Sequence, residues 1–203
     1  MAAVTAMLEE LRDAVPLTAR GAAGKFVAQE WTPGGKPRDG VETSWRKDGI
    51  RGWTQTFRSG AVRVSFAVWV RDVDESGCFD DLDAVYEQGE QALAAFLPEI
   101  EGSPLAGHLA EAELTAADKE EFVAARKWAV DGRVLTAGVV QQDTDLPVMV
   151  VVVLEARESS GAVSLVRDHT AGPAGRPAEA GARDADPLRQ GRARTCRRAA
   201  DPA

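Results

Sequence analysis

The sequence contains few cysteines, few histidines and no long apolar run, and each shortage argues against a class of protein. Two cysteines, Cys78 and Cys196, cannot build a disulfide framework. With only His108 and His169 present, a hydrolytic triad or a histidine-rich metal site is disfavoured. The longest apolar run, Val148–Leu154, is far shorter than the roughly 20 residues that span a bilayer. We therefore expect neither a disulfide-rich secreted protein nor a membrane protein.

Aromatic residues and lysine are missing from the end of the chain, where none occurs after Trp128. From residue 158 to 203, 28 of 46 residues are Ala, Arg, Gly or Pro. Such a segment buries too little apolar surface to offset the entropy lost on ordering. We predict one folded domain over residues 1–156 and a tail over 157–203. The tail is either a disordered extension or a shifted-frame reading of GC-rich DNA.

The charge is uneven along the chain, whose formal net charge is −8. Up to Arg157 there are 26 acidic and 16 basic residues, which makes the body −10. A body of that charge repels phosphate, so we expect no nucleic-acid partner. The start, Met1–Val15, is acidic and lacks the basic region of a signal peptide. Together with an excess of Arg over Lys, this indicates a cytoplasmic protein from a high-GC bacterial genome.

Helical periodicity occurs in four segments. Val4–Val15 has an amphipathic pattern ended by a proline, and Phe79–Leu97 carries a second apolar stripe. The Ser103-Pro104 pair predicts a short helix through Ala112. Thr115, with Asp118 three residues later, forms a capping box for a helix that we expect to reach about Lys127.

Alternating apolar residues predict strands, and dipeptides such as Asp48-Gly49 predict tight turns between them. The expected strands are Lys25–Trp31, Val41–Arg46, Trp53–Phe57, Ala61–Arg71, Trp128–Val130, Val134–Val140 and Val148–Leu154. The predicted fold is therefore α+β, an antiparallel β-meander with amphipathic helices packed on one face, in the order α-ββββ-α-α-βββ. Trp45-x-x-Asp48-Gly49 and Trp128-x-x-Asp131-Gly132 match, which hints at two related halves.

The sharpest candidate for a ligand site is the acidic loop between the fourth strand and the following helix. Over residues 72–83, twelve in all, it resembles the calcium loop of an EF-hand, with alternating oxygen-bearing side chains before a glycine turn. It departs from that pattern because a strand enters it and because its last ligand position is Asp rather than Glu. The candidate Ca²⁺ ligands are Asp72, Asp74, Ser76, Asp80 and Asp83. No other cofactor is implied, and capping of the following helix is the simpler interpretation.

A second candidate is a surface of aromatic and arginine side chains. The alternation of Ala61–Arg71 places Trp69 on the same face as Arg63 and Arg71, opposite the apolar face. Such residues are enriched at interfaces, whereas Trp45 and Trp53 are explained by core packing. We therefore expect a non-enzymatic acidic module that binds a protein partner, as small immunity proteins, secretion chaperones and adaptors do. Calcium binding is the alternative function, and a small-ligand enzyme is a third.

Overall fold

The computed structural model describes residues 2–35, 37–73, 80–143 and 146–156, which belong to one compact unit. The predicted tail, 157–203, lies outside the described residues. The described helices are α1 (Ala2–Arg12), α2 (Ala19–Ala28), α3 (Asp80–Glu101) and α4 (Ala116–Glu121), with a 3₁₀ turn η1 (Pro104–His108). The strands are β1 (Thr32–Pro33), β2 (Ser44–Lys47), β3 (Ile50–Thr56), β4 (Val62–Arg71), β5 (Leu109–Ala112), β6 (Ala124–Val130), β7 (Arg133–Val140) and β8 (Val148–Ala156).

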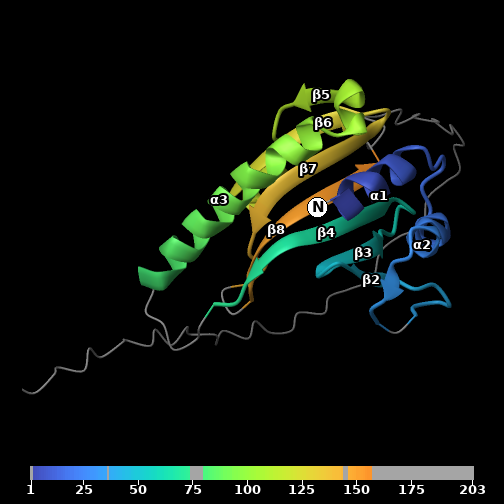
Figure 1. The fold of residues 1–203 in the computed structure, drawn as a ribbon, viewed down its shortest axis with the longest axis horizontal. Helices are drawn as coiled ribbons and strands as arrows, with labels where there is room; N and C mark the ends of the chain where they lie inside the picture. The colour runs from blue at the N-terminus through green and yellow to red at the C-terminus, as the bar shows by residue number, and fades with distance from the viewer. Residues whose placement is uncertain (1, 36, 74–79, 144–145, 157–203) are drawn as a thin grey trace, which may run out of the picture. The chain divides into compact units, whose positions relative to one another are not determined.

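All eight strands form one antiparallel sheet in the order β1-β2-β3-β4-β8-β7-β6-β5. Helices α1, α2 and α3 pack on one side of it, which we call the first face (Figure 1). The main core lies between these helices and the sheet, around Phe66, Phe96 and Val152. The α+β class and the packing of α1 and α3 on one face are as the sequence predicted. Helix α4 departs from this, because Phe122, the residue that follows it, packs on the opposite side of the sheet. None of the helices in the described ranges is both long and apolar enough to cross a membrane.

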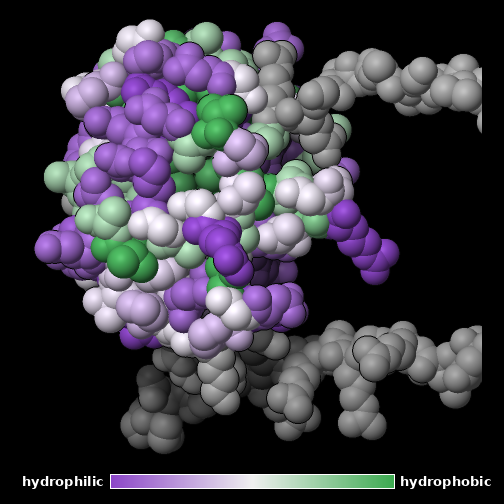
Figure 2. Space-filling view, turned by 90° about the vertical axis from the view of Figure 1, so that its right-hand side faces the viewer, coloured by the Kyte–Doolittle hydropathy of each residue, from purple (hydrophilic) through white to green (hydrophobic). Residues whose placement is uncertain are grey.

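The opposite side of the sheet, the second face, carries a smaller cluster of buried residues. Phe122, just after α4, lies over Gly138 so closely that a Cβ there would stand 2.5 Å from its ring. With Val140, Val151 and Val153 it forms this cluster. Figure 2 shows hydrophilic residues gathered at the upper left, on the helix side of the sheet, and a mixture of apolar and polar residues elsewhere.

The predicted strand Lys25–Trp31 is wrong, because most of this segment belongs to helix α2. The Thr18 side chain caps the helix by accepting a hydrogen bond from the backbone N–H of Gly21. Ala22 and Phe26, four residues apart, face the core. The Phe26 ring stacks on Trp45 with 5.1 Å between ring centroids, so packing onto β2 stabilises a helix where the local pattern favoured a strand.

Two further boundaries differ between Ser103 and Val130. The predicted helix through Ala112 ends at His108, and the chain continues as β5, which pairs with β6. The Thr115 capping box is confirmed, but α4 ends at Glu121 rather than near Lys127. Strand β6 begins at Ala124 because β7 supplies hydrogen-bonding partners along its whole length. The elements therefore depart from the predicted ones in three places: helix α2 replaces the first predicted strand, and the strands β1 and β5 were not predicted.

The strand order reads symmetrically about the central pair, β4 and β8. Each half is a meander of four strands, and each contains one of the two matching Trp-x-x-Asp-Gly fragments. Asp48-Gly49 and Asp131-Gly132 both have positive φ at both residues, as a type I′ hairpin turn requires. Trp45 and Trp128 are both buried in the main core. This equivalence of position supports the hypothesis of two related halves.

Candidate functional site

The structure places Trp69 on the first face, so its predicted grouping with Arg63 is wrong. A β-bulge between Ala67 and Trp69 shifts the pairing with β8, and Trp69 lies opposite Val150 of the main core. A Cβ on Gly89 of α3 would stand 3.5 Å from the Trp69 ring. The bulge inserts one residue and thereby reverses the face of every side chain that follows it.

Arg63 and Arg71 consequently point to opposite sides of the sheet. Arg63 lies on the second face, where its Nε donates to Glu155 Oε2 (2.9 Å) and its Nη1 to Glu121 Oε1 (2.8 Å). Burial lowers the pKa of Arg63, but the charges of Glu155 and Glu121 outweigh it and hold that pKa above its usual value. Arg71 is exposed at the end of β4, opposite Val148 of the first face. The three predicted partner-binding residues do not form one surface.

A different pair of arginines meets on the second face. The two-residue turn at Asp48-Gly49 pairs Trp45 with Gly52, so the neighbouring residues Arg46 and Arg51 stand directly opposite each other on the other side. Directly opposed side chains have Cβ atoms about 5 Å apart. Trp53 is two residues farther along β3 on the same side. Trp45 lies in the main core as expected, whereas Trp53 packs against the second-face cluster.

These three residues, Arg46, Arg51 and Trp53, form what we call the Arg–Trp patch. Both arginines are exposed, and neither makes an ion pair with any residue that the structure describes. Trp53 is half-buried against the second-face cluster. Like charges directly opposite each other in a sheet are destabilising. The patch is thus a local concentration of positive charge beside an aromatic ring, in a body whose net charge is negative.

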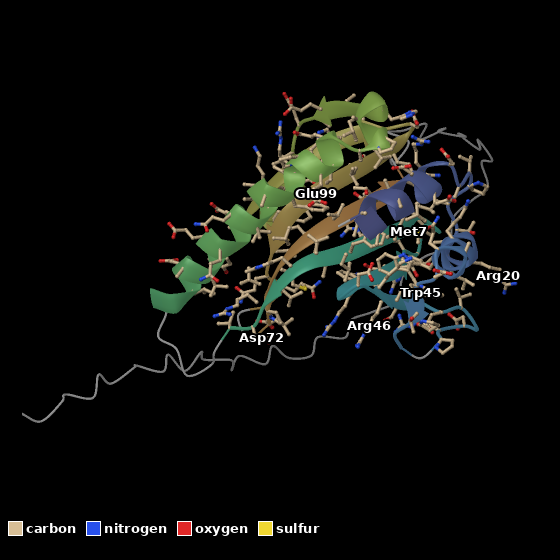
Figure 3. All side chains as sticks on the ribbon, viewed as in Figure 1. Met7, Arg20, Trp45, Arg46, Asp72 and Glu99 are labelled. Carbon is tan, nitrogen blue, oxygen red and sulfur yellow. The ribbon has the colours of Figure 1, made fainter. Side chains whose placement is uncertain are left out.

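The loop after β1 approaches the patch closely. A Cβ on Gly34 would stand 2.7 Å from Ser44 Oγ and 3.5 Å from Arg46 Cγ, so a side chain there would require Ser44 to move. Figure 3 shows Arg46 at the lower margin of the sheet, while Trp45 lies next to α2 and Arg20 projects from α2 away from the body. The aliphatic stem of Arg46 thus passes close to Gly34, and Arg46 is exposed with no described ionic partner.

The predicted calcium loop lies largely outside the described residues. Asp74 and Ser76 are not described, and of Asp80 only the backbone, as the first residue of α3, is described. Asp72 and Asp83, at the two ends of the loop, are exposed. No three His, Cys, Asp or Glu side chains within the described ranges lie close enough together to hold a metal ion. Calcium binding by this loop stays a prediction.

The sequence did contain a signal for the Arg–Trp patch. The two-residue turn Asp48-Gly49 sets the register of the hairpin, so each residue of β2 pairs with the residue of β3 that lies equally far from the turn. Applied to β2 and β3, this rule places Arg46 opposite Arg51 and turns Trp53 away from Trp45. The bulge in β4 has no such signal, because no glycine or proline marks it.

Comparison of the chain with models of known protein families, with curated proteins and with solved structures finds no match.

Proposed function

We propose that this protein is a cytoplasmic, non-enzymatic interaction module that binds an acidic segment of a protein partner through the Arg–Trp patch. One observation carries the proposal. Arg46 and Arg51 are exposed, directly opposed and without a described ionic partner, beside the half-buried ring of Trp53. Arginine and tryptophan are the residues that most often dominate the energy of protein interfaces.

The chemistry of the patch fits carboxylates. Each guanidinium offers a planar fork of N–H donors that can hold a carboxylate through two hydrogen bonds. Two carboxylates of a partner would neutralise Arg46 and Arg51 and remove their mutual repulsion. Trp53 would supply apolar contact area next to them. Binding would therefore relieve an electrostatic cost that the free protein carries.

The negative charge of the body does not oppose this docking at short range. At about 0.15 M salt the Debye length is about 8 Å, so charges farther away are largely screened. The exposed acids of α3, such as Asp83, Glu87 and Glu90, lie on the helix side of the sheet. The partner's carboxylates, in contrast, would touch the two guanidinium groups directly.

The test compares partner capture by variants of the full chain. Arg46→Gln with Arg51→Gln removes both charges of the patch, and Arg20→Gln with Arg58→Gln removes two exposed charges elsewhere that make no described ion pair. We expect a stoichiometric partner, and an oligo-glutamate peptide used as a charge probe, to bind the wild type and the control but not the patch variant. Binding should weaken as the salt concentration rises.

The opposite outcome would contradict the proposed function. If the patch variant and the control variant retain the same partner with the same affinity, the Arg–Trp patch does not bind it. Unchanged melting temperatures of both variants show that any loss of binding does not arise from unfolding.

A further inference from the structure

A cleft of about 450 Å³ opens on the second face, between α4 and the hairpin that joins β3 to β4. Its size lies within the range of small-molecule sites in proteins. Apolar side chains line much of it, among them Ala61, Ala117 and Val134, and Phe57 stands at the hairpin. The cleft uses none of the residues of the Arg–Trp patch, so a ligand in the cleft is independent of the proposed function.

Arg63 is the main cation of the cleft, and three groups hold it. Glu155 and Glu121 accept its hydrogen bonds, and its guanidinium lies 5.5 Å from the centroid of the Phe57 ring. The other cation, Lys127, is engaged elsewhere. Its Nζ donates to Asp118 Oδ2 at 2.5 Å, and the same carboxylate oxygen belongs to the capping box of α4.

The two carboxylates that accept hydrogen bonds from Arg63 are held in place to different degrees. Glu155 lies on β8 directly opposite Arg63 in the sheet, so its backbone is held by the central strand pair. Glu121 is the last residue of a six-residue helix, and its side chain is 39% exposed. An ion pair that is this exposed contributes little to stability. Glu121 is therefore the partner that a competing anion can replace at small cost.

We propose that this cleft binds a small monocarboxylate with an apolar body. The ligand's carboxylate takes the place of Glu121 on the Arg63 guanidinium, and its apolar part lies against Ala61, Ala117 and Val134. Glu121 then turns outward into solvent. In the free protein, Glu121 thus occupies the position of the ligand's carboxylate. A free carboxylic acid and the C-terminal carboxylate of a peptide share this chemistry.

The experiment titrates the full chain with hexanoate, N-acetyl-leucine and N-acetyl-leucinamide and follows the Nε–H resonance of Arg63 by NMR. We expect the two carboxylates to shift this resonance and the amide to leave it unchanged. Binding of N-acetyl-leucine without hexanoate would identify a chain terminus as the ligand, and binding of hexanoate would identify a free acid. If no carboxylate shifts the resonance, the proposal is overturned.

Two matched variants test the competition by Glu121. Glu121→Gln frees Arg63 and should tighten carboxylate binding by up to about fivefold. Glu120→Gln removes the same charge one residue away, where the side chain is exposed and makes no described ion pair, and should leave the affinity nearly unchanged. Equal affinities in the two variants would show that Glu121 does not compete.

Loss of Arg63 completes the test. Arg63→Gln should abolish carboxylate binding, as followed by the backbone amide resonances of α4 and β4. Arg63→Lys keeps the charge but lacks the fork of donors, and should bind more weakly than the wild type. If Arg63→Gln unfolds the protein, Arg63→Lys carries the comparison. Wild-type affinity in either folded variant would overturn the assignment.

Discussion

Trp69 of β4 packs against Gly89 of α3, so the bulge in β4 is matched by a helix position without a side chain. A Cβ on Gly89 would stand 3.0 Å from Val139 Cγ1 and 3.5 Å from Trp69 Cζ3. Glycine in the middle of a helix normally costs stability relative to alanine. Here the missing side chain instead allows α3 to approach β4 and β7 closely.

This relationship predicts opposite outcomes at two helical glycines. A Cβ added at Gly24 of α2 would meet no atom within 4 Å, so Gly24→Ala should raise the free energy of unfolding by about 1 kcal/mol. Gly89→Leu should lower it by about 1–3 kcal/mol, because the added atoms overpack the contact with Trp69 and Val139. Denaturant unfolding of both variants checks this. A stabilising Gly89→Leu would mean that α3 does not pack so closely on the sheet.

The opposed arginines of the Arg–Trp patch predict a stabilising substitution. Arg51→Glu converts a directly opposed like-charge pair with Arg46 into an opposite-charge pair, which should raise the free energy of unfolding by about 0.2–1 kcal/mol. The same variant should lose the partner. Arg58→Glu, at an exposed position without a described ion pair, is the control and should change stability less. Equal effects at both positions would argue against the hairpin register.

Arg133 is a buried cation whose replacement should lower the free energy of unfolding. It is 6% exposed, and its two terminal nitrogens donate to the backbone carbonyls of Leu11 and Ala14 at the end of α1. Arg133→Met should lower the free energy of unfolding by about 1–3 kcal/mol, because these charge-assisted hydrogen bonds are lost. Hydrogen exchange should accelerate in α1. Arg126→Met, which removes exposed ion pairs with Glu101 and Glu111, should cost at most about 1 kcal/mol.

The lowered pKa of Asp118 should make the protein less stable in acid. Burial raises the pKa of Asp118, but hydrogen bonds from Lys127 and Thr115 outweigh it and hold that pKa below its usual value. A carboxylate whose pKa is lower in the folded state stabilises the protein above its unfolded pKa of about 3.9, and this contribution is lost as the pH falls through the folded value. Stability should therefore decline below about pH 4.

Asp118→Asn should flatten this decline, as measured by chemical denaturation at several pH values. Part of the decline should persist, because the hydrogen bond from Arg12 also holds the pKa of Asp13 below its usual value. Glu113→Gln, an exposed change without a described partner, should leave the pH profile as in the wild type. A profile of Asp118→Asn that matches the wild type would show that Asp118 is not held as described.

Several elements were predictable because their signals are local. The alternation in Ala61–Ala67 places its apolar residues in the core, and the run Val148–Leu154 is buried on both faces of the sheet. The capping box of Thr115 and Asp118 needs only a four-residue turn, and it starts α4 as expected. Both Asp-Gly turns follow from the positive φ that this dipeptide tolerates.

Other elements depended on contacts between distant segments. Residues 25–31 have the composition of a strand, but Phe26 packs on Trp45 and Phe66, and this packing favours the helix. Strand β6 extends back to Ala124 only because β7 pairs with it. In the candidate site, the alternation of β4 correctly placed Arg63 on the second face. It also placed Trp69 there, whereas the bulge puts Trp69 on the first face.

The class of the fold, the acidic body and the hairpin turns follow from the sequence alone, because they depend on periodicity, composition and turn chemistry over short stretches. Which tryptophan accompanies which arginine, in contrast, depends on the registers of the strands in the folded sheet. A strand has a side-chain period of two, so a single inserted residue in β4, or a two-residue turn between β2 and β3, changes the face on which a side chain emerges. The Arg–Trp patch and the Arg63 cleft exist because of those registers.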